Sequence, residues 1–195
     1  MSGAGQGVPR QLRLFFALWP GESHRAALAR AAVAAVAQVA GRPVPPGNLH
    51  VTLAFLGEVP GRSFGGLAAI GAQGSWPAVR LDFGRIEYWA KPKALVAMPE
   101  AVPAAGQAIV DRLWQGLGPL GFTREPRPWQ PHLTLVRRVS RPPPENLEMA
   151  PVLPVSGAPA WRLALVDSLA GPDGPRYKPL ADWPLGGDSW RGQTP

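Results

Sequence analysis

Residues 48–53 read Asn-Leu-His-Val-Thr-Leu, and residues 131–137 read Pro-His-Leu-Thr-Leu-Val-Arg. Both stretches contain His-x-Thr-Leu, so two of the three histidines in the chain have a threonine two residues later and a leucine after it. Each motif lies in an apolar run that follows a proline-containing loop, which is typical of a β-strand that begins after a turn. The repeat therefore predicts two equivalent strands that each carry a His–Thr pair.

The spacing within each motif predicts where the side chains point. Residues two apart on a strand project from the same face, so His50 and Thr52 project together while Val51 points into the core. His132 and Thr134 have the same relation. If the two strands belong to two similar lobes, two imidazoles and two hydroxyls converge on one cleft. Such a set suits a phosphate, because the hydroxyls donate hydrogen bonds to its oxygens and the imidazoles transfer protons.

The rest of the chain predicts an alternation of helices and strands. Hydrophobic periodicity and turn residues predict strands over 12–18, 49–56, 79–89, 94–98, 132–139, 161–169 and 176–180, with helices between Ser23 and Gly41, over 61–73 and over 100–117. The proline-rich residues 141–159 predict an irregular loop. Because no Gly-rich dinucleotide loop is present, the order favours an α+β fold over a doubly wound nucleotide-binding fold. We expect one domain over residues 12–185, with flexible tails at 1–11 and 186–195.

The composition limits the kinds of function that the chain can have. Cysteine is absent, which excludes disulfide scaffolds, thiolate metal sites and thiol nucleophiles. The net charge of +7 favours polyanionic partners, of which nucleic acid is the first to consider. Residues 1–11 lack the basic start and apolar run of a secretory signal, and the apolar stretch at 31–40 is too short to span a membrane. We expect a cytoplasmic, monomeric protein without a membrane segment.

The two motifs, together with Arg-Leu-Phe-Phe-Ala-Leu at 13–18, resemble the two-histidine (2H) phosphoesterases. Within them, the chain is similar to the RNA 2′,3′-cyclic phosphodiesterases, also called 2′-5′ RNA ligases, over residues 12–185. The resemblance implies two pseudo-symmetric α+β lobes, with antiparallel sheets and flanking helices around a central cleft. It also implies hydrolysis of an RNA-terminal 2′,3′-cyclic phosphate to a 2′-phosphate without a metal or other cofactor, and reversible 2′-5′ ligation by the same residues.

The resemblance also implies roles for particular residues. His132 becomes the general base and His50 the general acid, although the similarity of the two motifs leaves these roles interchangeable on sequence alone. Thr52 and Thr134 hold the phosphate. Arg137 stands five residues after His132, where the family places a basic residue. Because an odd offset along a strand faces away from His132, this arginine needs a bulge, a strand end or a long reach to contact the phosphate.

Aromatic and basic residues near the motifs predict further contacts with RNA. We expect Phe15 to stack on a terminal base, and Trp129 and Tyr177 are weaker candidates for the same role. Arginines cluster around the second motif, and they form either a solvated surface or a rim that follows an RNA backbone. The members of this cluster are Arg124, Arg127, Arg137, Arg138 and Arg141.

Other interpretations of the same residues stay open at this point. The protein can be a non-catalytic module that binds RNA ends, or a cyclic phosphodiesterase for a small nucleotide. His50 and His132 can be half-buried strand residues satisfied by neighbouring hydroxyls, although their duplication argues against this. A metal site made of histidines lacks a third ligand at suitable spacing, so we predict none. His24 lacks a threonine partner, and we expect it on the surface.

Overall fold

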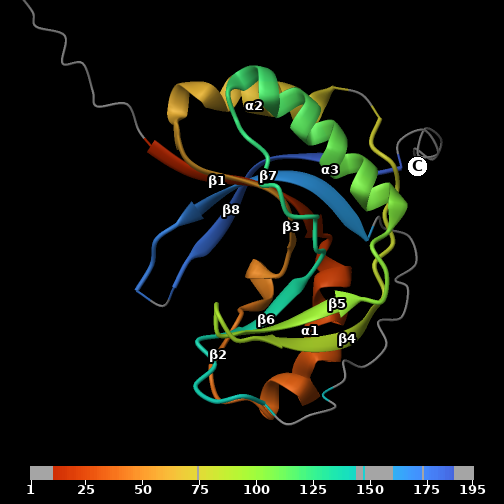
Figure 1. Cartoon of the computed structure of the whole chain (residues 1–195), viewed down its shortest axis with the longest axis vertical. Coiled ribbons are helices and arrows are strands. Elements are labelled where there is room, and N and C mark those ends of the chain that lie inside the picture. The colour runs from red at the N-terminus through yellow and green to blue at the C-terminus, as the bar shows by residue number, and fades with distance from the viewer. Residues whose placement is uncertain (1–10, 74, 144–146, 148–159, 173, 187–195) are drawn as a thin grey trace, which may run out of the picture.

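The structure is a computed structural model, in which residues 11–73, 75–143, 147, 160–172 and 174–186 are described. These residues form eight strands and three α-helices, which Figure 1 labels. The strands are β1 (Gln11–Pro20), β2 (Arg42–Pro43), β3 (Val51–Pro60), β4 (Phe83–Trp89), β5 (Ala94–Pro99), β6 (Leu133–Arg137), β7 (Trp161–Leu169) and β8 (Arg176–Pro184). The helices are α1 (Glu22–Ala37), α2 (Phe64–Ala72) and α3 (Ala104–Leu117).

The strands form two four-stranded antiparallel sheets (Figure 1). The first sheet has the order β3-β1-β7-β8 and takes its strands from both ends of the described chain. The second has the order β2-β6-β5-β4 and comes from the middle of the chain. The first motif begins β3 and the second begins β6, so each sheet carries one motif. This arrangement confirms the predicted α+β fold with two lobes and two antiparallel sheets.

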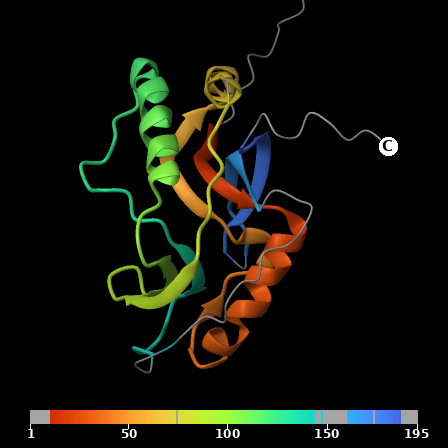
Figure 2. The ribbon, with the colours of Figure 1, turned by 90° about the vertical axis from the view of Figure 1, so that its right-hand side faces the viewer.

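The helices divide between the two ends of the molecule (Figure 2). Helices α2 and α3 contact strands of the first sheet, whereas α1 contacts β6 of the second sheet. The alanine-rich sequence of α1 has high helix propensity. In α3, the residues Ile109, Val110, Leu113 and Leu117 form one buried stripe. Since α1 follows β1 directly but packs toward the other lobe, the chain itself ties the two lobes together.

Strand β1 is buried on both faces and separates two apolar clusters. Leu14, Phe16 and Leu18 belong to the main core. Phe15, Ala17 and Trp19 face the other way, because side chains alternate along a strand, and they pack with Ala164 and Val166. In the second sheet, a matching cluster consists of Ala94, Val96 and Met98, with Trp89 packed against it. The two smaller clusters each lie beside one of the motif histidines.

Several predicted boundaries are wrong by a few residues. Helix α1 begins at Glu22 after Gly21, and Ser23 makes no capping hydrogen bond. Gly57 does not end the second strand. Its φ of +74° fits a bulge in the pairing of β3 with β1, and β3 continues to Pro60. Gln11 already belongs to β1. Gly186 is the other described residue of the predicted tails. Residues 1–10 and 187–195, and most of the predicted loop at 141–159, lie outside the described residues.

The prediction that His24 lies on the surface is wrong. Only 8% of this residue is exposed, and its ring meets that of Trp161 edge-on at 5.0 Å between centroids. The helix turns His24 toward the core together with Leu28. Burial lowers the pKa of His24, because an imidazolium loses its hydration there. The side chain therefore acts as a neutral packing residue at pH 7.

The contact between α2 and β8 leads to a stability prediction. A Cβ atom added at Gly71 would lie 2.2 Å from the ring of Trp183, whereas one added at Gly65 in the same helix would meet nothing within 4 Å. We expect Gly71→Ala to destabilise the fold by about 1–3 kcal/mol through overpacking. Gly65→Ala should instead stabilise it by up to about 1 kcal/mol, through helix propensity. Urea unfolding of the two variants measures the difference, and equal midpoints would contradict the packing described.

Candidate active site

His50 is held in one orientation by the residues around it. Its Nδ1 donates a hydrogen bond to the carbonyl oxygen of Asn48 at 2.7 Å. The side chain of Asn48 in turn donates to the carbonyl of Pro175 at 2.7 Å and accepts from the backbone N–H of Tyr177 at 3.2 Å. Because a carbonyl can only accept, Nδ1 carries the proton and Nε2 is left as the nitrogen that exchanges protons.

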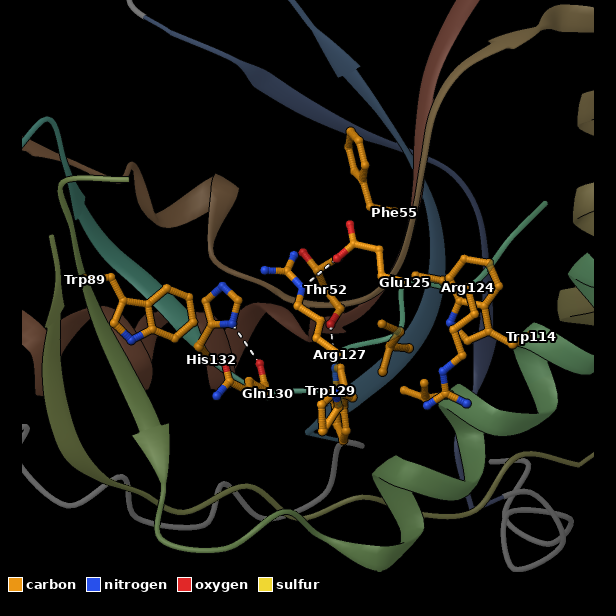
Figure 3. Close-up of a pocket in the computed structure, with 14 residues that line it drawn as sticks. Thr52, Phe55, Trp89, Trp114, Arg124, Glu125, Arg127, Trp129, Gln130 and His132 are labelled. Carbon is orange, nitrogen blue, oxygen red and sulfur yellow. Dashed lines mark hydrogen bonds and ion pairs between the residues drawn. The ribbon is translucent and has the colours of Figure 1, made fainter. Parts of the chain in front are cut away.

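His132 is held by the same device in the other lobe. Its Nδ1 donates to the carbonyl oxygen of Gln130 at 2.8 Å, again two residues earlier in the chain (Figure 3). The ring of Trp89 packs beside it, with 4.5 Å between centroids. The two motif histidines therefore share one tautomer, fixed by the backbone of their own loops. The sequence repeat extends to the hydrogen bonds that orient the rings.

The alternation predicted within the motifs is confirmed by burial. Val51 and Leu133, between the histidine and threonine of each motif, are both 0% exposed. Thr52 and Thr134 are half-buried. Thr52 lines the same pocket as His132, so the first motif and the second motif meet in one hollow. Neither His50 nor Thr134 lines this pocket, so it holds only two of the four side chains predicted to converge on one cleft. Thr134 lies on β6 opposite Val96.

A bulge brings Arg137 to the site. Thr134 pairs with Val96, but Val136 pairs with Leu95, so β6 contains one extra residue at this point. The extra residue reverses the alternation of side chains beyond it. Arg137, five residues after His132, therefore lies on the same face as His132 and not on the opposite one. Its Nη2 donates to the hydroxyl oxygen of Tyr177 at 3.2 Å. Arg137 thus reaches from the second sheet to Tyr177 on β8 of the first, and its contact with a phosphate stays a prediction.

The same bulge occurs in the first motif. Ala17 pairs with Thr52, but Phe16 pairs with Ala54, so β3 also has one extra residue directly after its threonine. By this correspondence Phe55 occupies the position in the first lobe that Arg137 occupies in the second. Phe55 is 48% exposed, and the guanidinium carbon of Arg13 lies 5.0 Å from the centre of its ring.

Burial and positive charge make both imidazoles hard to protonate in the free protein. Burial lowers the pKa of His50 to about 4, assisted by the charges of Arg137 and His132 and opposed by the hydrogen bond to Asn48. The pKa of His132 is also lowered, mainly by burial and further by Arg137 and Arg127. Both rings are therefore neutral at pH 7. An anion that compensates Arg137 would make it easier for either ring to hold a second proton.

A pocket of about 150 Å³ opens next to His132 (Figure 3). The Nε1–H of Trp129 donates to the carbonyl oxygen of Thr52 at 2.8 Å, which ties the loop before the second motif to the first motif. Arg127 forms an ion pair with Glu125 at 2.5 Å, and Arg124 forms one with Asp111 at 2.7 Å. The pocket is lined by Thr52, Leu53, Ala54, Phe55, Trp89, Val110, Trp114, Arg124, Glu125, Arg127, Pro128, Trp129, Gln130 and His132.

Phe55, Trp89, Trp114 and Glu125 line the pocket, although none of them was predicted to be a site residue. Trp114 also packs against the main core. Phe15, in contrast, was identified but is only 3% exposed. Its ring lies 5.0 Å from His50 and 5.2 Å from Tyr177, so it packs beneath the imidazole and has no open face for a base.

Within the described ranges, no helix combines the length and the apolar character that a membrane crossing requires. The same residues contain no group of three or more His, Cys, Asp or Glu side chains placed to hold a metal ion. The monomeric state, the cytoplasmic location and the single domain over 12–185 stay predictions.

Known proteins resemble this chain over nearly its whole length. A family model described as the 2′-5′ RNA ligase superfamily matches residues 20–170. This chain belongs to the 2′-5′ RNA ligase superfamily. The match confirms the resemblance drawn from the two motifs.

Among the relatives of this superfamily member is an RNA 2′,3′-cyclic phosphodiesterase of Thermus thermophilus. It is 31% identical over 193 residues, which cover 94% of this chain and 95% of the relative. A solved structure of Escherichia coli LigT in complex with 3′-AMP has a TM-score of 0.72 at 26% identity, covering 91% of this chain and 99% of LigT. The structure of TT0787 of Thermus thermophilus has a TM-score of 0.66 at 31% identity, covering 88% and 97%.

Proposed function

We propose that this protein is an RNA 2′,3′-cyclic phosphodiesterase that works by two-histidine general acid–base catalysis. The observation that carries the proposal is the pair of imidazoles, each fixed through Nδ1 by its own backbone and both within the electrostatic influence of Arg137. The name of the Thermus thermophilus relative supports the choice of substrate. Escherichia coli LigT has also been crystallised with phosphate and with 3′-AMP, which fits a site for phosphate and nucleotide.

In the proposed reaction, water attacks the phosphorus of the cyclic phosphate. His132 accepts the proton of the water as a bond forms between the water oxygen and phosphorus. The bond between phosphorus and the 3′ oxygen breaks, and protonated His50 donates its proton to that oxygen. The product keeps a 2′-phosphate and gains a 3′-hydroxyl. We take the roles of base and acid from the family resemblance.

The remaining site residues stabilise the charge on phosphorus oxygens. Thr52 and Thr134 donate hydroxyl hydrogen bonds to the non-bridging oxygens, and Arg137 compensates their negative charge. Burial is the main reason that the pKa of His50 is low in the free protein, and the guanidinium charge of Arg137 adds to it, so a bound phosphate offsets part of the cost of protonating His50. The substrate therefore helps the acid to acquire the proton that it later donates.

The proposed ligation uses the same atoms with a different nucleophile. If the 5′-hydroxyl of a second RNA strand replaces water, the same imidazole accepts its proton and the same 3′ oxygen leaves. The product is then a 2′-5′ linkage, and no ATP is consumed because the cyclic phosphate supplies the free energy. No step of either direction calls on a metal ion.

The test is product analysis on an oligonucleotide that ends in a 2′,3′-cyclic phosphate. We expect conversion to a 2′-phosphate end, at the same rate with and without a chelator. A product with only 3′-phosphate ends, or loss of the reaction with EDTA, would contradict the mechanism. Salt-sensitive binding of RNA ends without turnover would instead identify a binding module. Turnover of a mononucleotide alone would indicate a small-nucleotide phosphodiesterase.

A further inference from the structure

Phe55 presents an exposed aromatic ring to the pocket next to the paired histidines. Its neighbours Leu53 and Ala54 on β3 are 4% and 2% exposed, whereas Phe55 is 48% exposed. The ring is held from one side by Arg13, whose guanidinium carbon lies 5.0 Å from the ring centre. Arg13 is itself paired with Glu58 at 3.5 Å. Phe55 is thus a restrained ring that water can reach.

The pocket connects Phe55 with the reacting groups. Thr52, His132, Phe55 and Trp114 all line it. Figure 3 shows the ion pair of Arg127 and Glu125 in the centre of the pocket, beside Thr52, and Glu125 is the nearer of the pair to Phe55. Because of the bulge after Thr52, the stretch from Thr52 to Phe55 lies opposite only two steps of β1, so at about 3.3 Å per step Phe55 is roughly 7 Å along the sheet from Thr52.

Other aromatic rings are closer to the reacting phosphate than Phe55. Trp89 contacts the ring of His132, and Tyr177 contacts that of His50 with 4.9 Å between centroids. The nucleoside that carries the cyclic phosphate therefore meets Trp89 or Tyr177 first. Phe55 lines the same pocket as His132 but follows Thr52 along β3, where the neighbouring nucleotide of the strand can reach it.

We propose that Phe55 is the stacking platform for the base of the nucleotide that precedes the one with the cyclic phosphate. The inference rests on the proposed function and narrows its substrate class to RNA strands of two or more nucleotides. Arg127 then contacts the phosphodiester that joins the two nucleotides, since its guanidinium has five donors and its pair with Glu125 leaves others free.

The charges around Phe55 indicate that stacking supplies most of the gain in binding that a second nucleotide brings. Arg13, Arg124 and Arg127 each have an acidic partner, so the local charge is close to balanced. A base stacked on an aromatic ring strengthens binding by about 5- to 100-fold, and any of the four bases can stack. The preference for a second nucleotide should therefore be tolerant of sequence.

The experiment compares kcat/KM for adenosine 2′,3′-cyclic phosphate with kcat/KM for a diadenosine dinucleotide that ends in the same group. The wild-type protein should prefer the dinucleotide, and a dinucleotide whose first residue lacks its base should lose that preference. Phe55→Leu, which keeps an apolar side chain but removes the ring, should lower the preference by about tenfold. Phe55→Tyr should retain it. Leu120→Ala removes an equally exposed apolar side chain that does not line the pocket, and it serves as the control.

The results distinguish a failure of the proposed stacking platform from a failure of the proposed phosphodiesterase function. Equal losses on both substrates in Phe55→Leu, or an abasic dinucleotide that reacts as fast as the intact one, would overturn the stacking platform. A preference that is retained in Phe55→Leu would also overturn it. If the wild-type protein hydrolyses neither substrate, the proposed function itself fails. Thermal unfolding of each variant confirms that the compared proteins are folded.

Discussion

His50→Ala and His132→Ala should each lower kcat/KM for an RNA 2′,3′-cyclic phosphate by about 10²- to 10⁴-fold, because each removes one proton-transfer group. Folding should be retained, since neither ring is part of the main apolar core. His24→Leu is the matched control, because it removes the third histidine of the chain from a buried position in helix α1. Its kcat/KM should equal that of the wild-type protein. Steady-state hydrolysis and circular dichroism measure both properties.

A change of leaving group separates the acid from the base. When sulfur replaces the 3′ oxygen, the leaving thiolate is far more stable than an alkoxide and needs little help from a general acid. The variant that lacks the acid should recover most of its rate with this substrate, and the variant that lacks the base should not. Recovery in His50→Ala would support the roles taken from the family resemblance. Recovery in His132→Ala would reverse them, and recovery in neither would contradict the leaving-group step.

Arg137→Gln should lower kcat/KM by about 10- to 100-fold, the usual cost of losing a charged hydrogen bond to an anion. It should also change the pH dependence in a defined direction. The guanidinium lowers the pKa of both His50 and His132, so its removal raises both pKa values. The active protein needs a neutral base, and the acidic limb of the pH profile should therefore move to higher pH. NMR titration of the imidazole protons in the free protein provides an independent measurement.

Arg138→Gln is the matched control for this experiment. It removes the same charge one residue away, on an exposed side chain whose charge does not contribute to the lowered pKa of either histidine. Its pH profile should coincide with that of the wild-type protein. Equal shifts in the two variants would indicate a general effect of net charge and would remove the special role of Arg137. In the wild-type protein, the acidic limb should lie below pH 6.5, because burial lowers the pKa of His132.

The sequence predicted those parts of the fold that depend on local alternation. The period of two in His-x-Thr-Leu was enough to predict that Val51 and Leu133 are buried and that Thr52 and Thr134 are not. It was also enough to identify the two strands as equivalent members of the two lobes. The side of Arg137 could not be predicted, because the bulge after Thr134 depends on how β6 pairs with β5 and not on the residues of β6 alone.

Residues that reach the site from distant elements were the hardest to predict. Trp89 comes from the hairpin of the second sheet, and Glu125 comes from a loop; neither stands in a motif. His24 shows the opposite problem, since a polar residue near a helix start suggests a surface position. Its burial follows from the rotation of α1 against Trp161, which only tertiary packing determines. Phe15 was identified correctly as a neighbour of the site, but its depth beneath His50 was not predictable.

During synthesis, the two sheets receive their last strands at different times. The sheet behind His132 is made only of strands up to β6, so all of its strands are synthesised before the last part of the chain. The sheet behind His50 has β7 in an internal position and β8 at its edge, and both are made last. A nascent or prematurely terminated chain that ends before β7 would hold one half of the reaction centre and would lack the framework of the other.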